Sequence, residues 1–175
     1  MKYLVIAVAT LLTTATIAQS KKFTFKLGSE YELPRKAADL SFFGNDKDGI
    51  VNMGLNKEEL TILRSDLKTL VQSTEKAIEL PEMTKNFNSE GVVDFDGNYY
   101  WLHSDWDKKD EIEYLYYDKI DVVSGKITES NKKLFQAERI AGSSAVMTGF
   151  YWYKMGGKYD FNFDADRTKL LISYR

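Results

Sequence analysis

The sequence predicts an all-β protein built from antiparallel strands. Short apolar runs recur between polar turn segments along most of the chain, and aromatic residues, which make up 14% of the sequence, gather in alternating or clustered runs. Short runs at such spacing are typical of antiparallel all-β proteins, and aromatic side chains suit the pleated surface of a strand. We therefore expect hairpins and small sheets over most of the chain.

The first 18 residues have the three parts of a cleavable secretory signal peptide. Lys2 supplies a positive start, an apolar run follows from Leu4 to Leu12, and small residues lead to Ala18. The apolar run is about half the ~20 residues that a membrane-spanning helix needs. We expect cleavage between Ala18 and Gln19, no membrane span in the mature chain, and a secreted or periplasmic location.

Composition narrows the chemistry of the mature chain. The sequence contains no cysteine, which excludes a cysteine nucleophile, cysteine-ligated zinc and disulfides, so packing or bound ions must hold a secreted domain together. The net charge is −2, with acidic and basic residues interleaved. Because there is no basic stripe, nucleic acid is not an expected partner.

The residues before Gly49 predict an N-terminal strand and loop at 19–48. Phe23–Leu27 alternates apolar and polar side chains, which indicates a half-buried strand. Pro34–Leu40 has a weak signal for one helical turn, and Gly44–Gly49 has the composition of a turn.

A regular rhythm of predicted strands begins at Gly49 and ends at Pro81. Ser65 and Asp66 give a turn signal inside it. Four short apolar runs make up the rhythm: Ile50–Met53, Leu60–Leu63, Leu67–Val71 and Lys76–Leu80.

The next part of the chain repeats this plan. Gly91–Asp94 matches the residues that begin at Gly49, and Ile112–Asp118 matches those that begin at Leu60. The two segments of the second match are farther apart in the sequence than the two segments of the first match. We expect the extra residues, within Asp96–Glu111, to form a longer hairpin loop.

A third unit begins at Asn162–Asp164, which matches Asp94–Asp96, and a turn and a strand then follow up to Ile172. Lys132–Ile140 has a weak helical periodicity that predicts one helix.

A period of about 40–50 residues with four short strands per unit is typical of propeller blades. In this rhythm the chain resembles the WD-repeat-like β-propellers of secreted bacterial envelope proteins. The resemblance implies an incomplete β-propeller with antiparallel four-stranded blades at about 49–90 and 91–141 and a partial blade at 142–175. No Trp-Asp pair closes a blade and no Gly-His pair opens one.

Two or three blades leave open strand edges, because a propeller closes with at least four blades. We therefore expect a piece of a longer propeller protein, or association with another chain through the open edges. The alternative fold is a small β-sandwich or a single curled antiparallel sheet.

Acidic clusters give a candidate metal site. Asp94, Asp96 and Asn98 have the spacing of calcium ligands, and Asp105 stands at the twelfth position, where a calcium loop of the EF-hand type has glutamate. The same residue types form tight β-turns. Calcium is therefore the minority interpretation, and a turn is the main one.

Three tryptophans are the candidate ligand-binding residues, because aromatic rings on loops stack on sugars and peptides. They are Trp101, Trp106 and Trp152, with Trp106 favoured because it falls in the expected longer loop. Packing inside strands is the alternative. His103, the single histidine, is expected to be a strand or loop residue, since triad members converge from separate segments.

The function that these observations favour is a secreted, non-enzymatic binding or scaffold module with a protein or glycan ligand. No catalytic residue is singled out. One alternative is the N-terminal propeller portion of an envelope hydrolase whose catalytic domain lies elsewhere. The other is a calcium-stabilised glycan-binding module.

Overall fold

The computed structural model describes Leu27, Glu30 and residues 39–56, 59–80, 87–153 and 157–174. The expected signal peptide and its cleavage site at Ala18 and Gln19 lie outside the described residues. So do the predicted strand before Leu27 and most of the predicted helical turn, whose last two residues begin a strand instead.

The described residues form twelve antiparallel strands and no helix, so the predicted all-β fold is confirmed. Sheet A contains the first four strands, in the order β1-β2-β3-β4. Its strands are β1 (Asp39–Asn45), β2 (Gly49–Leu55), β3 (Glu59–Ser65) and β4 (Gln72–Glu79).

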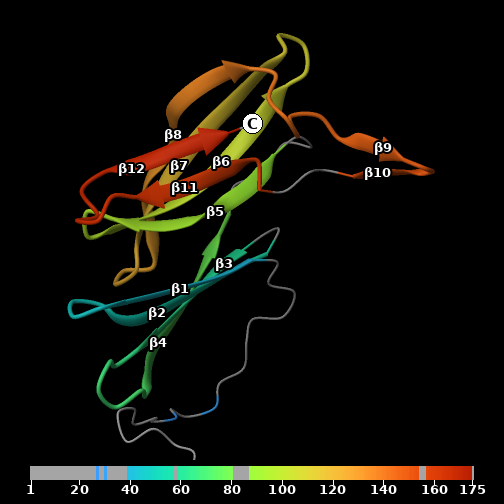
Figure 1. Ribbon diagram of the computed structural model, residues 1–175. Helices are drawn as coiled ribbons and strands as arrows, with labels where there is room; N and C mark the ends of the chain where they lie inside the picture. Colours follow the sequence, from blue (N-terminus) through green and yellow to red (C-terminus); the bar gives the residue numbers. More distant parts are fainter. Residues whose placement is uncertain are drawn as a thin grey trace, which may run out of the picture.

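Sheet B has the same meander order, β5-β6-β7-β8. Two hairpins follow it, and Figure 1 shows the β9–β10 hairpin projecting from the body of the molecule. The strands are β5 (Asn88–Phe95), β6 (Asn98–Asp107), β7 (Ile112–Asp121), β8 (Lys126–Glu138), β9 (Val146–Thr148), β10 (Tyr151–Tyr153), β11 (Tyr159–Phe163) and β12 (Leu170–Tyr174).

Side-chain alternation in β6 divides the core between the two faces of sheet B. Tyr99, Trp101 and His103 point to one face, and Leu102 and Ser104 point to the other, and all five are buried. A strand buried on both faces needs a partner layer on each side.

Sheet A covers the first face. Met53 and Ile62 of sheet A lie in one buried cluster with Tyr99, Trp101 and Ile120 of sheet B. Each such side chain stabilises the fold by roughly 1.5–3 kcal/mol relative to an exposed one. The two sheets are therefore packed face to face.

The β11–β12 hairpin covers the second face. Tyr159 of β11 is buried in a cluster with Leu115 of β7, and Phe135 of β8 and Ile172 of β12 pack against it. Figure 1 shows this hairpin lying across sheet B, with sheet A below sheet B in this view. Sheet A contacts the face that carries Tyr99 and Trp101. Sheet A, sheet B and the hairpin thus form three successive layers.

Three predicted segments have a different structure. Leu67–Val71 is a turn and not a strand, because the Asp66 side chain accepts hydrogen bonds from the backbone N–H groups of Lys68 and Thr69. The expected loop within Asp96–Glu111 is mostly strand, since β6 and β7 have ten residues each where β2 and β3 have seven.

The predicted helix at Lys132–Ile140 is wrong, since β8 continues to Glu138. Phe135 and Ala137 are half-buried, while Gln136 and Glu138 between them are exposed, which is the two-residue period of a strand.

The repeat inferred from the sequence can be compared with the strand order of the two sheets. Leu60 and Ile112 lie in the third strands of their sheets, as the match implies. Gly49 and Gly91 are not equivalent, because Gly49 begins the second strand of sheet A and Gly91 lies in the first strand of sheet B. The first strand of sheet A precedes the predicted start of the repeat.

Candidate functional site

Turns of sheets A and B line an open polar hollow of about 470 Å³, here called the turn-end hollow. The β1–β2 turn supplies Lys47 and Asp48, and strands and turns of sheet B supply the rest of the lining, including Tyr99, Lys119 and Asp121. Five of its lining residues carry a charge: Lys47, Asp48, Lys119, Asp121 and Glu129.

A hydrogen-bond network fixes the wall of this hollow between the sheets. The Asn45 side chain donates to the Tyr99 hydroxyl at 2.8 Å, and that hydroxyl donates to the Asp48 carboxylate at 3.2 Å. Arg64 donates to the carbonyl oxygen of Asp48 at 3.1 and 3.3 Å, and its guanidinium lies 3.8 Å from the carboxylate. The turn of sheet A is therefore tied to β6 of sheet B.

Burial, with the nearby Asp48 charge, raises the pKa of Tyr99 to about 12. The hydroxyl thus stays protonated at physiological pH and remains a hydrogen-bond donor to Asp48. The Tyr99 hydroxyl therefore holds the β1–β2 turn in place on this wall.

The opposite wall carries a second set of polar contacts. Lys119 lies 3.8 Å from Glu129, which also accepts a hydrogen bond from the Tyr117 hydroxyl at 3.1 Å. The Asp121 carboxylate accepts a hydrogen bond from the backbone N–H of Val123 at 2.9 Å, and this bond is the main reason why the pKa of Asp121 is lowered. The hollow therefore presents fixed charges of both signs.

A second polar group of side chains is enclosed between sheet B and β11. Lys158 is in direct contact with the Glu113 carboxylate and lies 3.5 Å from Glu90, whose carboxylate accepts a hydrogen bond from Ser104 at 2.6 Å. The side chains of the lysine and both glutamates are 0–1% exposed. We call these four residues the buried carboxylate cluster.

Two carboxylates share one ammonium group in this cluster. One oxygen of Glu90 and one of Glu113 have no hydrogen-bond partner among the described residues. Burial is the main reason why the pKa of Glu90 is raised, and the Glu113 charge adds to it. Through Lys158, the cluster connects the start of the β11–β12 hairpin to sheet B.

The predicted tryptophan site is not a surface platform. Trp101 is 1% exposed and its indole donates to Ser89, and Trp106 is 5% exposed. The two rings lie on opposite faces of β6, because they are an odd number of residues apart. Trp152 lies in β10, and its side chain is outside what the structure describes.

The predicted calcium ligands form a tight turn. Asp96 and Gly97 have φ angles of 49° and 65° and join β5 to β6, which is the geometry of a two-residue type I′ hairpin. The Asn98 side chain donates to the Asp96 carbonyl at 2.7 Å, and the Asp94 carbonyl accepts from Arg167. No group of three or more acidic, histidine or cysteine side chains in the described part of the chain is arranged to hold a metal ion.

His103 lies in β6, as expected of a strand or loop residue. Its ring is buried and stacks near Trp101 and Tyr116, at 4.9 and 5.7 Å between ring centroids. Its Nε2 lies 3.4 Å from the Asp118 carboxylate. Ser104 points to the other face of the strand, so the adjacent His and Ser do not form a triad.

Sequence reasoning missed the residues of both polar groups. A signal for the buried carboxylate cluster was present, since Glu113 alternates with Leu115 on the inward face of β7. The turn-end hollow had no local signal, because Lys47 and Lys119 are far apart in the sequence and look like ordinary surface lysines.

Comparison with models of protein families, with curated proteins and with solved structures gave no match to this chain. In the described part of the chain, no helix is long and apolar enough to cross a membrane.

Proposed function

We propose that this chain is a secreted, non-enzymatic binding or scaffold module with the construction of part of a β-propeller, and that its ligand occupies the turn-end hollow. The observation that carries the proposal is the stacking of three antiparallel layers with a polar hollow at the turn end of two of them. In propellers the sheets stack in this way.

Location and chemistry both favour binding at this hollow. Loops and turns on a rigid scaffold are where proteins place recognition residues, and a hollow with a few fixed polar groups orients a ligand. The Tyr99 network keeps one wall rigid. Charges of both signs favour a polar ligand such as a short peptide or a glycan over an apolar one.

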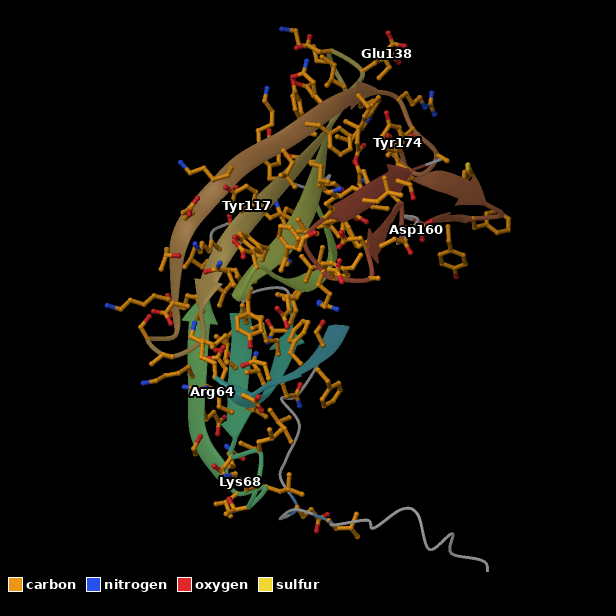
Figure 2. The ribbon with its side chains drawn as sticks, turned by 60° about the vertical axis from the view of Figure 1, so that its left-hand side comes forward. Arg64, Lys68, Tyr117, Glu138, Asp160 and Tyr174 are labelled. Atoms are coloured by element: carbon orange, nitrogen blue, oxygen red, sulfur yellow. The ribbon has the colours of Figure 1, made fainter. Side chains whose placement is uncertain are left out.

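The charge reversal Lys47→Glu tests the site. Lys47 is exposed and lines the hollow, so the change should alter ligand binding without unfolding the protein. The matched control is Lys68→Glu in the β3–β4 turn, which does not line the hollow. Figure 2 shows Lys68 at the end of sheet A that is distant from Tyr117 of sheet B.

The experiment is a titration of the full chain with panels of short peptides and oligosaccharides, followed by two-dimensional NMR. We expect at least one panel member to shift the resonances of Lys47, Tyr99 and Lys119, and Lys47→Glu to weaken that binding at least about tenfold, a difference of about 1.4 kcal/mol. Binding that Lys68→Glu weakens equally, or no shift at the hollow with any member, contradicts the proposal.

A further inference from the structure

The two faces of sheet B are covered unequally. On the sheet A side, Ile62 of β3 and Ile78 of β4 reach the cluster that contains Ile120 of β7 and contacts Ile127 of β8, so all four strands of sheet A meet sheet B. On the other side, the two strands of the β11–β12 hairpin lie on sheet B (Figure 1). Among the described residues, part of this second face has no covering layer.

The uncovered part is an apolar groove of about 330 Å³ beside β12, here called the β12 groove. Sheet B supplies its floor, with the aromatic rings of Tyr100 and Tyr117 packed edge to face at 5.4 Å. Leu134 of β8 is 42% exposed there. Every residue that lines the groove is apolar or aromatic, among them Tyr100, Leu102, Tyr117, Leu134, Leu170 and Ile172.

β12 has an open edge along this groove, since β11 is its only strand neighbour among the described residues. The hairpin closes with a hydrogen bond from the Asp164 N–H to the Lys169 carbonyl. In an antiparallel ladder, every second pair of facing residues is joined by backbone hydrogen bonds. Since Asp164 and Lys169 are one such pair, the next is Asn162 of β11 with Leu171 of β12. Leu170 and Ile172 then direct their N–H and C=O groups away from β11, to the open edge.

Leu170 and Ile172 therefore have two roles at one place. Their side chains line the β12 groove, and their backbone groups face the edge next to it. A strand that bonds to this edge would place every second side chain over Tyr117 and Leu134. Hydrogen-bonding groups and an apolar surface at this spacing are the two requirements for adding a strand to a sheet.

We propose that the open edge of β12 binds an extended segment of another protein by strand addition, with alternate apolar side chains of that segment in the β12 groove. The groove continues the existing interface between sheet B and the hairpin, which favours a strand as the occupant. A second copy of this chain fits poorly, because pairing two β12 edges would bring both sheets B to the same side of the joined hairpins, where they collide.

A peptide with the sequence of β3, Glu59–Ser65, is a suitable probe. It is the third strand of sheet A, and its Leu60 and Ile62, with Thr61 between them, pack on sheet B from the other side. The control peptide has lysine at both of these positions. Hydrogen exchange of the full protein should show the Leu170 and Ile172 amides slowed at least about tenfold by the probe and unchanged by the control peptide.

Two protein variants test the groove itself. Leu134→Lys puts a charge in the groove, and Leu171→Lys puts the same charge on the outer face of β12, where the side chain is 65% exposed. Both sites are accessible to solvent, so both variants should fold, and a thermal melt checks this. We expect Leu134→Lys to weaken probe binding at least about tenfold and Leu171→Lys to leave it within twofold.

Three results would overturn the proposal: no slowing at Leu170 and Ile172 with saturating probe, equal slowing with the control peptide, or equal loss of binding in both variants. The site is separate from the turn-end hollow, so Lys47→Glu should leave probe binding unchanged. The two proposals therefore fail independently.

Discussion

Phe95 and Phe163 stack with their ring centroids 6.1 Å apart, and each is the middle residue of one of the two matching tripeptides in the sequence. Both residues end the first strand of a hairpin, β5 for Phe95 and β11 for Phe163. The matching tripeptides therefore end a strand in two layers, although the turns that follow differ in length, and the shared aromatic residue joins the layers. Arg167 adds to the contact, since its guanidinium lies 4.1 Å from the Phe163 ring centroid.

Phe163→Ala should loosen the β11–β12 hairpin from sheet B. The change removes a half-buried ring and its aromatic contact, and we expect the free energy of unfolding to fall by about 1–3 kcal/mol. Urea denaturation measures this value. Phe150→Ala is the matched control, because the Phe150 side chain is 95% exposed and its loss should be neutral. An equal effect of the two changes would show that the stack does not hold the hairpin.

The buried carboxylate cluster should make stability depend on pH. The pKa of Glu90 is raised in the folded state above its usual 4.5, chiefly by burial. The stability that depends on its protonated form is therefore complete below pH 4.5 and is lost as the pH rises through the folded pKa. Asp66, Asp121 and Asp164 have lowered pKa values, so their contribution is lost only as the pH falls below 3.8.

Glu90→Gln tests this dependence, because glutamine keeps the shape and does not titrate. We expect the wild-type protein to lose stability as the pH rises above 4.5 and the variant to lose less, as measured by urea denaturation at a series of pH values. The control is Glu75→Gln on the exposed surface of β4, which should follow the wild type. Parallel curves for wild type and Glu90→Gln would rule out this account of the cluster.

Gly97→Ala should destabilise the β5–β6 hairpin through the backbone alone. Gly97 has a φ of 65°, and an added Cβ would meet nothing within 4 Å, so strain and not crowding is the cost. We expect a loss of about 1–2 kcal/mol. Gly44→Ala is the control, because its Cβ also meets nothing and its φ is not in the left-handed region.

The same hairpin decides between the turn and the calcium interpretation of Asp94, Asp96 and Asn98. Because Asp96 and Gly97 form a two-residue turn, we expect millimolar calcium to leave the melting temperature unchanged. If calcium raised the melting temperature and Asp96→Asn abolished that rise, the result would support the calcium interpretation instead.

Export can be tested on the full chain expressed in a bacterial host. If residues 1–18 act as a signal peptide, the exported protein should begin at Gln19, and mass spectrometry of the periplasmic and medium fractions measures this. Val8→Arg interrupts the apolar run and should hold the protein in the cell with its first 18 residues attached. Efficient export of this variant, or a mature protein that still begins at Met1, would refute the prediction.

The sequence alone determined the all-β fold class and most of the turns, because strands and turns depend mainly on neighbouring residues. Short apolar runs between polar turns identified β2 and β3, and Asp96 and Gly97 formed the two-residue turn that their residue types favour. Local patterns failed where two local signals competed. The Asp66 side chain capped a turn through Leu67 and Leu70, although their apolar character predicted a strand.

Only the tertiary structure decided which face each side chain occupies and what lies across from it. Trp101 and Trp106 both look like candidate binding residues in the sequence, but both are buried, and Trp101 lies in the cluster between sheets A and B. The turn-end hollow and the β12 groove likewise exist only because distant strands meet, at Lys47 with Lys119 and at Leu134 with Ile172. Burial and charge pairing depend on contacts between residues that are distant in the sequence, so no short stretch of sequence specifies them.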